Sequence, residues 1–202
     1  MSEVETLVDL IRHGEPEGGR MFRGVTDHPL SEQGWSEMRL ATTGEQRWQA
    51  VVTSPLRRCA EFAEALAGAR HLTLDTESRI REMDFGAWEG RTAEDILANG
   101  PGDLAAFWSD PERAEAPEGE ALAEFRDRVV AGWEGILDRH EGRHILVVAH
   151  GGVIRLLIAH TLGLPLTNLF RTEVGYACRT RLRAVTFDGA RSARLVAHGG
   201  FE

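Results

Sequence analysis

The chain has 202 residues, enough for one compact domain, and 42% of them are hydrophobic and 27% charged, as in ordinary globular proteins. This composition excludes intrinsically disordered, collagen-like and low-complexity chains. The net charge of −9 argues against a nucleic-acid partner, because clustered lysines and arginines supply the affinity for phosphate backbones. An anionic small-molecule substrate would need a local cationic pocket within this acidic surface.

The sequence predicts neither a membrane span nor a secretory signal. The longest apolar stretch, Val153–Ile158, is interrupted by Arg155 and is far too short to cross a bilayer. The segment Met1–Glu5 is acidic and runs directly into a strand-like segment. Two cysteines, Cys59 and Cys178, do not make a disulfide framework, so we expect buried, reduced thiols, a cytoplasmic location and no membrane partner.

Hydrophobic periodicity and turn residues predict that strands alternate with helices along the chain. The clearest helix, Glu120–His140, carries one apolar stripe at helical spacing, and Ser54-Pro55 would supply an N-cap and a first helical residue. In chain order, the expected elements are a strand at Val4–Ile11, a helix at Ser31–Leu40, a strand at Ala50–Thr53, a helix from Pro55 to about Leu66 that Gly68 closes, a strand at His71–Leu74, short helices at Thr92–Ala98 and Leu104–Trp108, a helix at Glu120–His140, a strand at His144–Ala149, a helix at Gly152–Leu162 and a hairpin of Tyr176–Phe187 with Ala193–Val196.

This alternation favours an α/β fold of three layers (αβα), in which helices flank an open and mostly parallel sheet. We expect a single domain over residues 1–202, with a short cap-like segment at about residues 86–119. Ligands of such sheets bind beyond the carboxyl ends of the strands. The sequence leaves the oligomeric state open, and a homodimer is one alternative.

Two histidines stand at the carboxyl ends of apolar strands. Arg12-His13-Gly14 follows the first expected strand, and His150-Gly151-Gly152 follows the strand at His144–Ala149. One such histidine alone is more often a turn residue, but two in the same setting point to a shared pocket. Glycine lets the backbone approach a ligand closely, and Gly151 begins a helix, where free N–H groups favour an anion.

An arginine pair lies at the start of the second expected helix. Arg57 is expected to be a solvated surface residue. Arg58, one position further round the first turn, could point back at the end of the sheet, where a guanidinium group suits a phosphate.

A carboxylate is the fourth candidate. The segment Arg81–Gly90 combines carboxylates with aromatic residues and two glycines, and Glu82 is its candidate general acid. The alternative for Glu82 is a surface salt bridge with Arg79 or Arg81.

Other chemistries fit the sequence poorly. It contains neither a phosphate-binding P-loop nor the nucleophile elbow of the α/β-hydrolases. Histidines also bind metals, but Arg12 adjoins His13, and guanidinium groups repel a divalent cation while they attract a phosphate dianion. We therefore expect no metal site.

These four segments, in this order, resemble the histidine phosphatase superfamily, which is also called phosphoglycerate mutase-like. LIRHGE resembles its strand and RHG motif, SPLRR its arginine segment, EMDFG its acid segment and HGG its second histidine. The resemblance spans roughly residues 4–187. Within the superfamily, the stretches RGVTDHPLSEQGW, DFGAWEGR and HGGVIRLLIA are most similar to the α-ribazole phosphatases of cobalamin biosynthesis.

The resemblance implies a role for each matched residue. His13 would be the nucleophile that forms a phosphohistidine, and Glu82 would be the general acid and then the base. Arg23 and Gly24 match a stretch that contacts substrate in relatives. The residues that would hold the phosphoryl oxygens are Arg12, Arg58, His150 and Gly151. No metal or organic cofactor is implied, and the cationic cluster would lower the pKa of His13 and keep it nucleophilic.

The sequence departs from the family pattern in two places. The threonine that commonly follows the RHG motif is Pro16 here, and the asparagine found in many members six residues after the nucleophile is Gly19. Other groups must replace these phosphate contacts. The alternatives are the backbone amides of Gly18-Gly19, Arg20 or Arg23.

The leading hypothesis is a metal-independent phosphomonoesterase that acts on α-ribazole 5′-phosphate or on the cobalamin 5′-phosphate that carries the same group. Trp88, Phe107 and Trp108 are expected to form an aromatic wall for the flat base of such a substrate. An alternative is a broad-range sugar-phosphate phosphatase or a phosphoglycerate mutase. Mutases usually carry a longer insertion and an ERxYG acid segment, whereas Asn99–Gly119 is short, which favours hydrolysis. A remote alternative is a non-catalytic phosphate-binding domain, although binding alone would need neither a nucleophile nor an acid.

Overall fold

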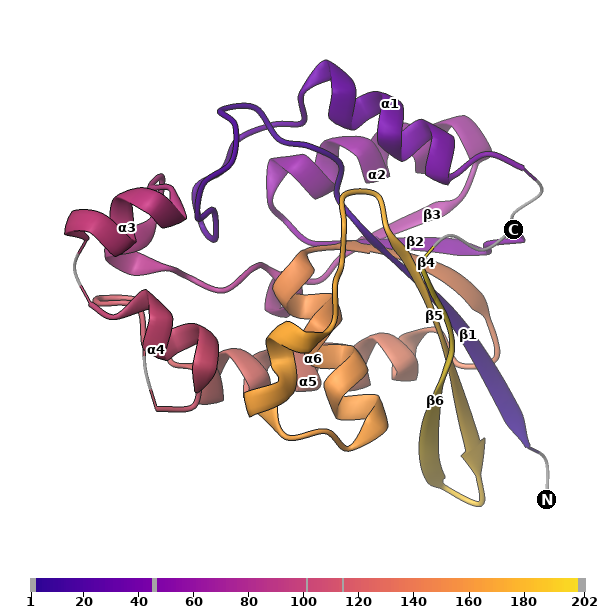
Figure 1. The fold of residues 1–202 in the computed structure, drawn as a ribbon. Helices are drawn as coiled ribbons and strands as arrows, with labels where there is room; N and C mark the ends of the chain where they lie inside the picture. The colour runs from indigo at the N-terminus through magenta and orange to yellow at the C-terminus, as the bar shows by residue number, and fades with distance from the viewer. Residues whose placement is uncertain (1–2, 45–46, 101, 114, 200–202) are drawn as a thin grey trace.

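The computed structural model describes residues 3–44, 47–100, 102–113 and 115–199, and it contains one sheet with helices on both faces (Figure 1). In chain order the elements are β1 (Val4–Arg12), α1 (Glu32–Ala41), β2 (Ala50–Thr53), α2 (Arg57–Arg70), β3 (Thr73–Thr76), η1 (Ser78–Ile80), η2 (Gly86–Trp88), α3 (Ala93–Asn99), α4 (Leu104–Ser109), α5 (Leu122–Arg139), β4 (His144–Ala149), α6 (Gly151–Leu162), η3 (Leu166–Arg171), β5 (Arg179–Phe187) and β6 (Ala190–Gly199).

The sheet has the strand order β3-β2-β4-β1-β5-β6. Strands β3, β2, β4 and β1 run parallel to one another, whereas β5 pairs antiparallel with both β1 and β6. The predicted αβα fold with an open and mostly parallel sheet is therefore confirmed. Residues 1–2 and 200–202 of the expected domain, and residues 101 and 114 of its expected cap, lie outside the described residues.

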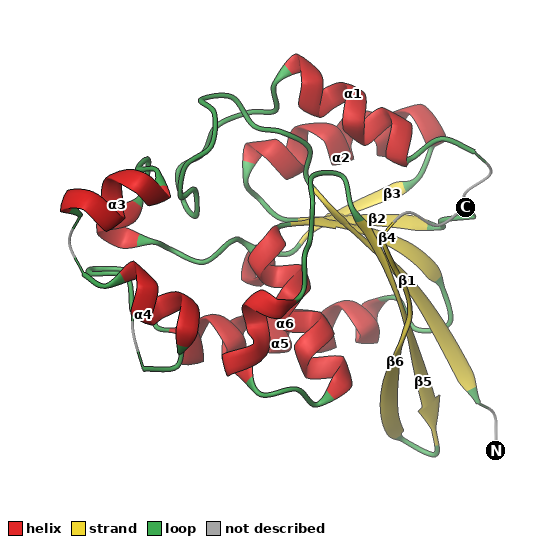
Figure 2. Cartoon of the chain, in the orientation of Figure 1, coloured by secondary structure: helices red, strands yellow, loops and turns green. Residues whose placement is uncertain are grey.

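The two faces of the sheet carry separate apolar cores, because side chains of a strand alternate between faces. On β4, Ile145 and Val147 pack with α5 and α6, and Leu146 and Val148 pack with α1 and α2. Figure 2 shows these two pairs of helices on opposite sides of the strands, with α3 and α4 beyond the sheet. Both faces of the central strands are thus covered, which leaves their carboxyl ends as the place for a ligand.

The second helix begins later than predicted. Its N-cap is Leu56, not Ser54, because the Ser54 hydroxyl is hydrogen bonded to Nε2 of His150 at 2.7 Å. The helix also continues through Gly68 to Arg70 and ends at His71, which takes a left-handed φ of 54°. A non-glycine residue in this conformation gives no reliable stop signal in the sequence.

The remaining expected elements are found with small shifts. The strand expected at His71–Leu74 lies two residues later, at Thr73–Thr76, and the hairpin turns at Asp188-Gly189 as predicted. Both cysteines are free, but Cys178 is only half-buried, contrary to expectation. Within the described residues, no helix combines the length and the apolar character needed to cross a membrane.

Candidate active site

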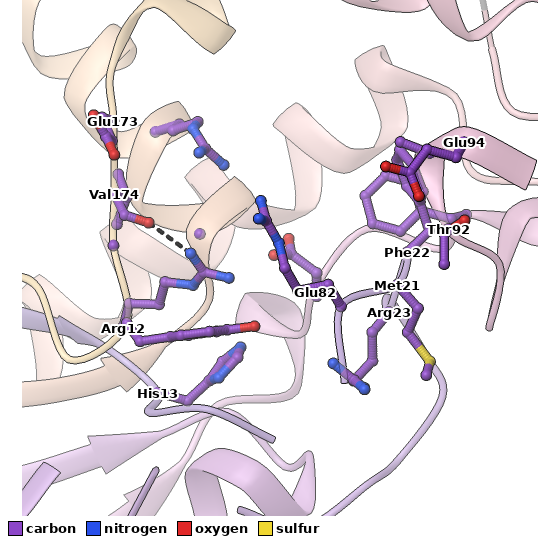
Figure 3. A pocket seen from close by; sticks show the side chains of 17 residues that line it. Arg12, His13, Met21, Phe22, Arg23, Glu82, Thr92, Glu94, Glu173 and Val174 are labelled. Carbon is purple, nitrogen blue, oxygen red and sulfur yellow. Dashed lines mark hydrogen bonds between the residues drawn. The ribbon is translucent and has the colours of Figure 1, made fainter. Parts of the chain in front are cut away.

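Three adjacent strands bring the sequence-predicted residues together. Because β4 lies between β2 and β1, the residues that follow these strands, Ser54, His150 and His13, meet at one edge of the sheet. The rings of His13 and His150 lie 5.3 Å apart between centroids. A cavity of about 860 Å³ opens at this edge (Figure 3). The predicted residues that line it are Arg12, His13, Arg23, Glu82 and Gly151.

Hydrogen bonds fix the tautomer of His13. Its Nδ1 lies 2.8 Å from the carbonyl oxygen of Gly14, and since a carbonyl only accepts, Nδ1 carries the proton. Nε2 therefore bears the lone pair, and it accepts a hydrogen bond from Nε of Arg58 at 3.3 Å. The turn needs glycine at position 14, because a Cβ there would overlap the backbone of Gly34.

Burial keeps both site histidines uncharged. Burial lowers the pKa of His13 well below its ordinary value, and the charges of Arg58 and Arg12 lower it further. Burial likewise lowers the pKa of His150, with Arg58 and His13 as the next causes. The predicted effect of the cationic cluster on His13 is present, but burial is the larger cause.

Arg12 presents an unpaired N–H group beside the cavity. Its Nη1 donates to the carbonyl of Val174 at 2.6 Å (Figure 3). Its guanidinium lies over the ring of Tyr176, 4.3 Å from the centroid. Its Nε is buried and has no hydrogen-bond partner among the described residues. A buried donor without a partner costs free energy, and an anionic ligand in the cavity would satisfy it.

Arg58 connects His13 to the neighbouring loop. The side chain is fully buried, and besides His13 it donates to the carbonyls of Thr26 at 3.0 Å and Gly24 at 2.8 Å. It therefore points at the end of the sheet, as predicted, but stands behind the cavity wall that the described residues form. Arg57 is exposed, as predicted, and it pairs with Glu61.

Glu82 lies at the N-terminus of α6. Its Oε2 accepts a hydrogen bond from the backbone N–H of Gly152 at 2.9 Å, and the side chain is only 7% exposed. A Cβ at Gly152 would overlap Oε1 of Glu82, so any larger residue there would displace the carboxylate. The alternative of a surface salt bridge is wrong for Arg79, which pairs with Glu77.

The side chains of Ser54 and Cys59 contact the ring of His150. Besides the hydrogen bond with Ser54, its ring lies 3.7 Å from Sγ of Cys59. The ring is fully buried and is absent from the cavity wall within the described part of the chain. It sits beside His13, on the sheet side of the cavity.

The loop with Arg23 and Gly24 supplies one side chain to the cavity and one close backbone contact beside it. Arg23 lines the cavity and donates to Nδ1 of His28 at 3.0 Å. Gly24 is absent from the wall that the described residues form, and a Cβ there would overlap the carbonyl oxygen of Met83. Its N–H donates to Glu89 at 2.8 Å, so this glycine permits close backbone packing.

The two departures from the family pattern also lie on this side. Gly18 and Gly19 have positive φ angles of 87° and 76° and form a turn that carries Arg20 to the cavity. Arg20 and Arg23 both line the cavity, whereas the two glycines are absent from its described wall. Of the alternatives considered, the arginines are thus the groups in place to replace the missing contacts.

The aromatic wall predicted from the sequence is wrong. Trp88 and Phe107 are buried in the apolar core with their ring centroids 5.3 Å apart. Trp108 is 42% exposed, and the described cavity wall does not include it. The aromatic side chains that do line the cavity are Phe22, Phe85 and Tyr176.

Other cavity residues escaped sequence reasoning. Arg155 follows Gly151 by one helical turn, so the helical spacing in HGGVIR could have revealed it. Tyr176 and Glu173 come from the segment before β5, where no motif marks them. Burial lowers the pKa of Arg155, and the charges of Glu82 and Glu173 oppose this effect.

No three His, Cys, Asp or Glu side chains gather as metal ligands within the described ranges.

The sequence matches the histidine phosphatase superfamily (branch 1) over residues 8–197. The chain belongs to this superfamily. It is accordingly a phosphatase, a hydrolase of phosphoric esters.

Relatives and solved structures agree with this assignment. Phosphoserine phosphatase 1 of Hydrogenobacter thermophilus is 30% identical over 165 residues, which are 80% of this chain and 78% of that protein. The YhfR protein of Bacillus stearothermophilus has a TM-score of 0.85 and 30% identity, with 98% of each chain covered. The α-ribazole phosphatase of Shigella flexneri has a TM-score of 0.78 and 26% identity, covering 94% of this chain and 95% of that chain. The chain also matches a bifunctional protein of Mycobacterium tuberculosis with 32% identity, but spans only 55% of its length.

Proposed function

We propose that this chain is a metal-independent phosphomonoesterase that forms a phosphohistidine on His13 and dephosphorylates α-ribazole 5′-phosphate, or the cobalamin 5′-phosphate that carries the same group. One observation carries the choice of nucleophile. The Gly14 carbonyl holds the proton on Nδ1 of His13 and leaves the lone pair of Nε2 available for attack. The depressed pKa of this buried ring supports the same role, because only the neutral imidazole is nucleophilic.

The reaction proceeds in two balanced steps. Nε2 of His13 attacks phosphorus in line, the ester P–O bond breaks, and Glu82 gives its proton to the leaving alkoxide. Water then attacks the phosphohistidine, Glu82 takes a proton from the water, and inorganic phosphate leaves with His13 restored. Arg12 Nε and the start of α6 at Gly151 line the cavity and offer N–H groups to the phosphoryl oxygens. Arg58 adds positive charge beside Nε2 of His13, and the neutral His150 can donate from its ring.

Replacement of His13 tests the nucleophile. His13→Ala should remove both turnover and an acid-labile phosphoenzyme, which quenched reactions with labelled substrate would detect. His160→Ala is a matched control, because His160 is exposed at the end of α6 and outside the described cavity wall. Near-normal turnover by the His13 variant would refute the mechanism.

A comparison of leaving groups tests the acid. Glu82→Gln should lower kcat/KM, which reports phosphohistidine formation and not its hydrolysis, about 10²–10⁴-fold on alkyl phosphates but much less on 4-nitrophenyl phosphate, because nitrophenolate leaves without a proton. Asp84 and Glu89 are weaker candidates, because both are absent from the cavity wall that the described residues form, whereas Glu82 lines it. Equal losses on both esters would contradict the assignment of Glu82.

Support for the substrate comes from the cavity and the relatives. The cavity is far larger than a phosphate group, and Phe22, Phe85 and Tyr176 line it with aromatic surface for a flat base. Stacking of a base on an aromatic ring is worth about 1–3 kcal/mol. The solved α-ribazole phosphatase aligns with nearly the whole chain. The test is kcat/KM on α-ribazole 5′-phosphate beside 3-phosphoglycerate, fructose phosphates and ordinary nucleoside monophosphates. A flat profile would remove the cobalamin assignment and leave the phosphatase standing.

A second candidate is a phosphatase or mutase of carboxylated or sugar phosphates. Arg155 and Arg20 favour it, because they add two guanidinium groups to the cavity beyond Arg12. The phosphoserine phosphatase relative favours it too. Highest kcat/KM on phosphoserine or phosphoglycerate in the same panel would select this candidate.

A further inference from the structure

The segment that carries Glu82 lies between the short helices η1 and η2, outside any longer element. One side chain of α5, Arg128, reaches across to hold it. Nη1 of Arg128 donates to the carbonyls of Arg79 at 2.8 Å and Arg81 at 2.7 Å, and Nη2 donates to the carbonyl of Glu82 itself at 2.9 Å. A single guanidinium group therefore binds three carbonyls over four consecutive residues.

Arg128 is itself fixed in place. The carboxylate of Glu120 binds it with both oxygens, at 2.5 Å from Nε and 2.7 Å from Nη2, and both side chains are largely buried. Its guanidinium also lies over the ring of Phe125, 4.8 Å from the centroid. Glu120 extends the contact past Glu82, because its backbone N–H donates to the carbonyl of Asp84 at 2.9 Å.

The sequence of α5 allows this close approach. Gly132 lies one turn after Arg128 on the same face of the helix. A Cβ at Gly132 would come within 3.0 Å of Cβ of Arg79 and 3.2 Å of Cγ2 of Ile80. The glycine lets the helix lie directly against η1, and the guanidinium of Arg128 then reaches the carbonyls beyond it.

We propose that Arg128 is a positioning residue for the general acid: it fixes the backbone of Glu82 so that the carboxylate stays at the N-terminus of α6 beside the cavity. This inference rests on the proposed role of Glu82. The planar fork of arginine suits the task, because its donors have fixed directions, whereas lysine offers one flexible ammonium group. Proton transfer requires hydrogen-bond geometry, so a small displacement of the segment weakens acid catalysis without altering the nucleophile.

The test compares two ester classes in Arg128→Met and Arg128→Lys. Arg128→Met should lower kcat/KM, which reports phosphohistidine formation alone, on an alkyl phosphate such as glycerol 3-phosphate by about 10–100-fold, the cost of a displacement near 1 Å. It should lower kcat/KM on 4-nitrophenyl phosphate by less than about 3-fold, because that leaving group needs no proton. Arg128→Lys should lie between Arg128→Met and the wild type, since an ammonium group can replace only part of the contacts.

Two further variants separate positioning from folding. Arg126→Met removes an exposed arginine of the same helix, which pairs with Asp127, and should leave both rates unchanged. Glu120→Gln weakens the support of Arg128 and should give the same selective loss on a smaller scale. Urea unfolding and circular dichroism establish that each variant is folded under the assay conditions.

The double variant Glu82→Gln/Arg128→Met decides between the explanations. If Arg128 acts through Glu82, the double variant is no slower on the alkyl ester than Glu82→Gln alone. The proposal would be overturned if the loss in the double variant equalled the product of the losses in the two single variants, or if Arg128→Met lost the same factor on both ester classes. Arg128 would then be a structural residue. A Glu82→Gln variant that shows no selectivity would instead refute the acid itself, and with it the positioning role.

Discussion

Acidification should destabilise this protein through its two site histidines. The pKa values of His13 and His150 are lowered in the folded state by burial, followed by nearby positive charges. In the unfolded chain the same side chains titrate near their ordinary value of about 6.5. Below that pH the unfolded state binds protons that the folded state rejects, so the free energy of unfolding falls as the pH falls.

The expected magnitude follows from this linkage. Each histidine that stays neutral in the folded state lowers the free energy of unfolding by about 1.4 kcal/mol for every pH unit below its unfolded pKa. The two together should lower the free energy of unfolding by about 3 kcal/mol between pH 7.5 and pH 5.5. The buried carboxylate of Glu77 does not contribute to the change between pH 7.5 and pH 5.5. The pKa of Glu77 is lowered to about 2, chiefly by its hydrogen bond from Arg79, and its contribution is lost only below the unfolded value of about 4.

Urea unfolding at pH 7.5, 6.5 and 5.5 measures the effect. The buffers must lack phosphate and sulfate, because an anion bound at the site would stabilise the folded state. His13→Gln should reduce the difference between pH 7.5 and pH 5.5 by about 1.4 kcal/mol. His160→Gln controls for the loss of an exposed imidazole. If His13→Gln keeps the full wild-type difference, the argument from burial is refuted.

Three further predictions concern the surroundings of the site. Dialysis against a chelator should leave the rate unchanged, and a strict need for added zinc or magnesium would contradict the cationic pocket. Gly152→Ala should slow alkyl phosphates more than 4-nitrophenyl phosphate, since its Cβ would displace Glu82; equal rates to wild type would show that the carboxylate can move freely. Glu89→Gln should destabilise the fold by about 1.5–3 kcal/mol in urea, because its carboxylate accepts N–H groups of Gly24, Val25 and Thr26; an unchanged midpoint would refute this.

The centre of the site could be predicted from sequence because parallel strands aim their carboxyl ends at one edge. His13 and His150 each follow an apolar strand, so their meeting needs only the fold class. The position of Glu82 follows less directly. Its segment is irregular: carboxylates, aromatic residues and glycines made Glu82 a candidate acid, and the family resemblance placed it with the histidines. The structure supplies the reason, since the N–H of Gly152 at the start of α6 donates to Oε2 of Glu82, and the missing Cβ at this glycine leaves room for Oε1.

The surroundings could not be predicted, because long-range partners decide them. Ser54 suits a helix N-cap by local propensity, yet a histidine 96 positions later takes its hydroxyl. Trp88 is an aromatic residue in a loop-rich segment, which suggested that it stacks on a ligand, but Phe22 and Phe107 pack against it and bury it. Tyr176, the chain's single tyrosine, reaches His13 only through the segment that leads into β5.

The site thus divides into two parts that are built differently. The part nearest His13 depends on close contacts of glycines: Gly14 lies against the backbone of Gly34, Gly24 against the carbonyl of Met83, and Gly152 against the carboxylate of Glu82. Substitution there moves main chain or the side chain of the acid and so disturbs the chemistry itself. The outer cavity is lined instead by side chains such as those of Arg20, Phe22, Glu94, Arg155 and Glu173, which can change without moving the strand ends. Substrate choice can therefore vary while the chemistry is kept, which is why one superfamily accommodates relatives named for α-ribazole and for phosphoserine.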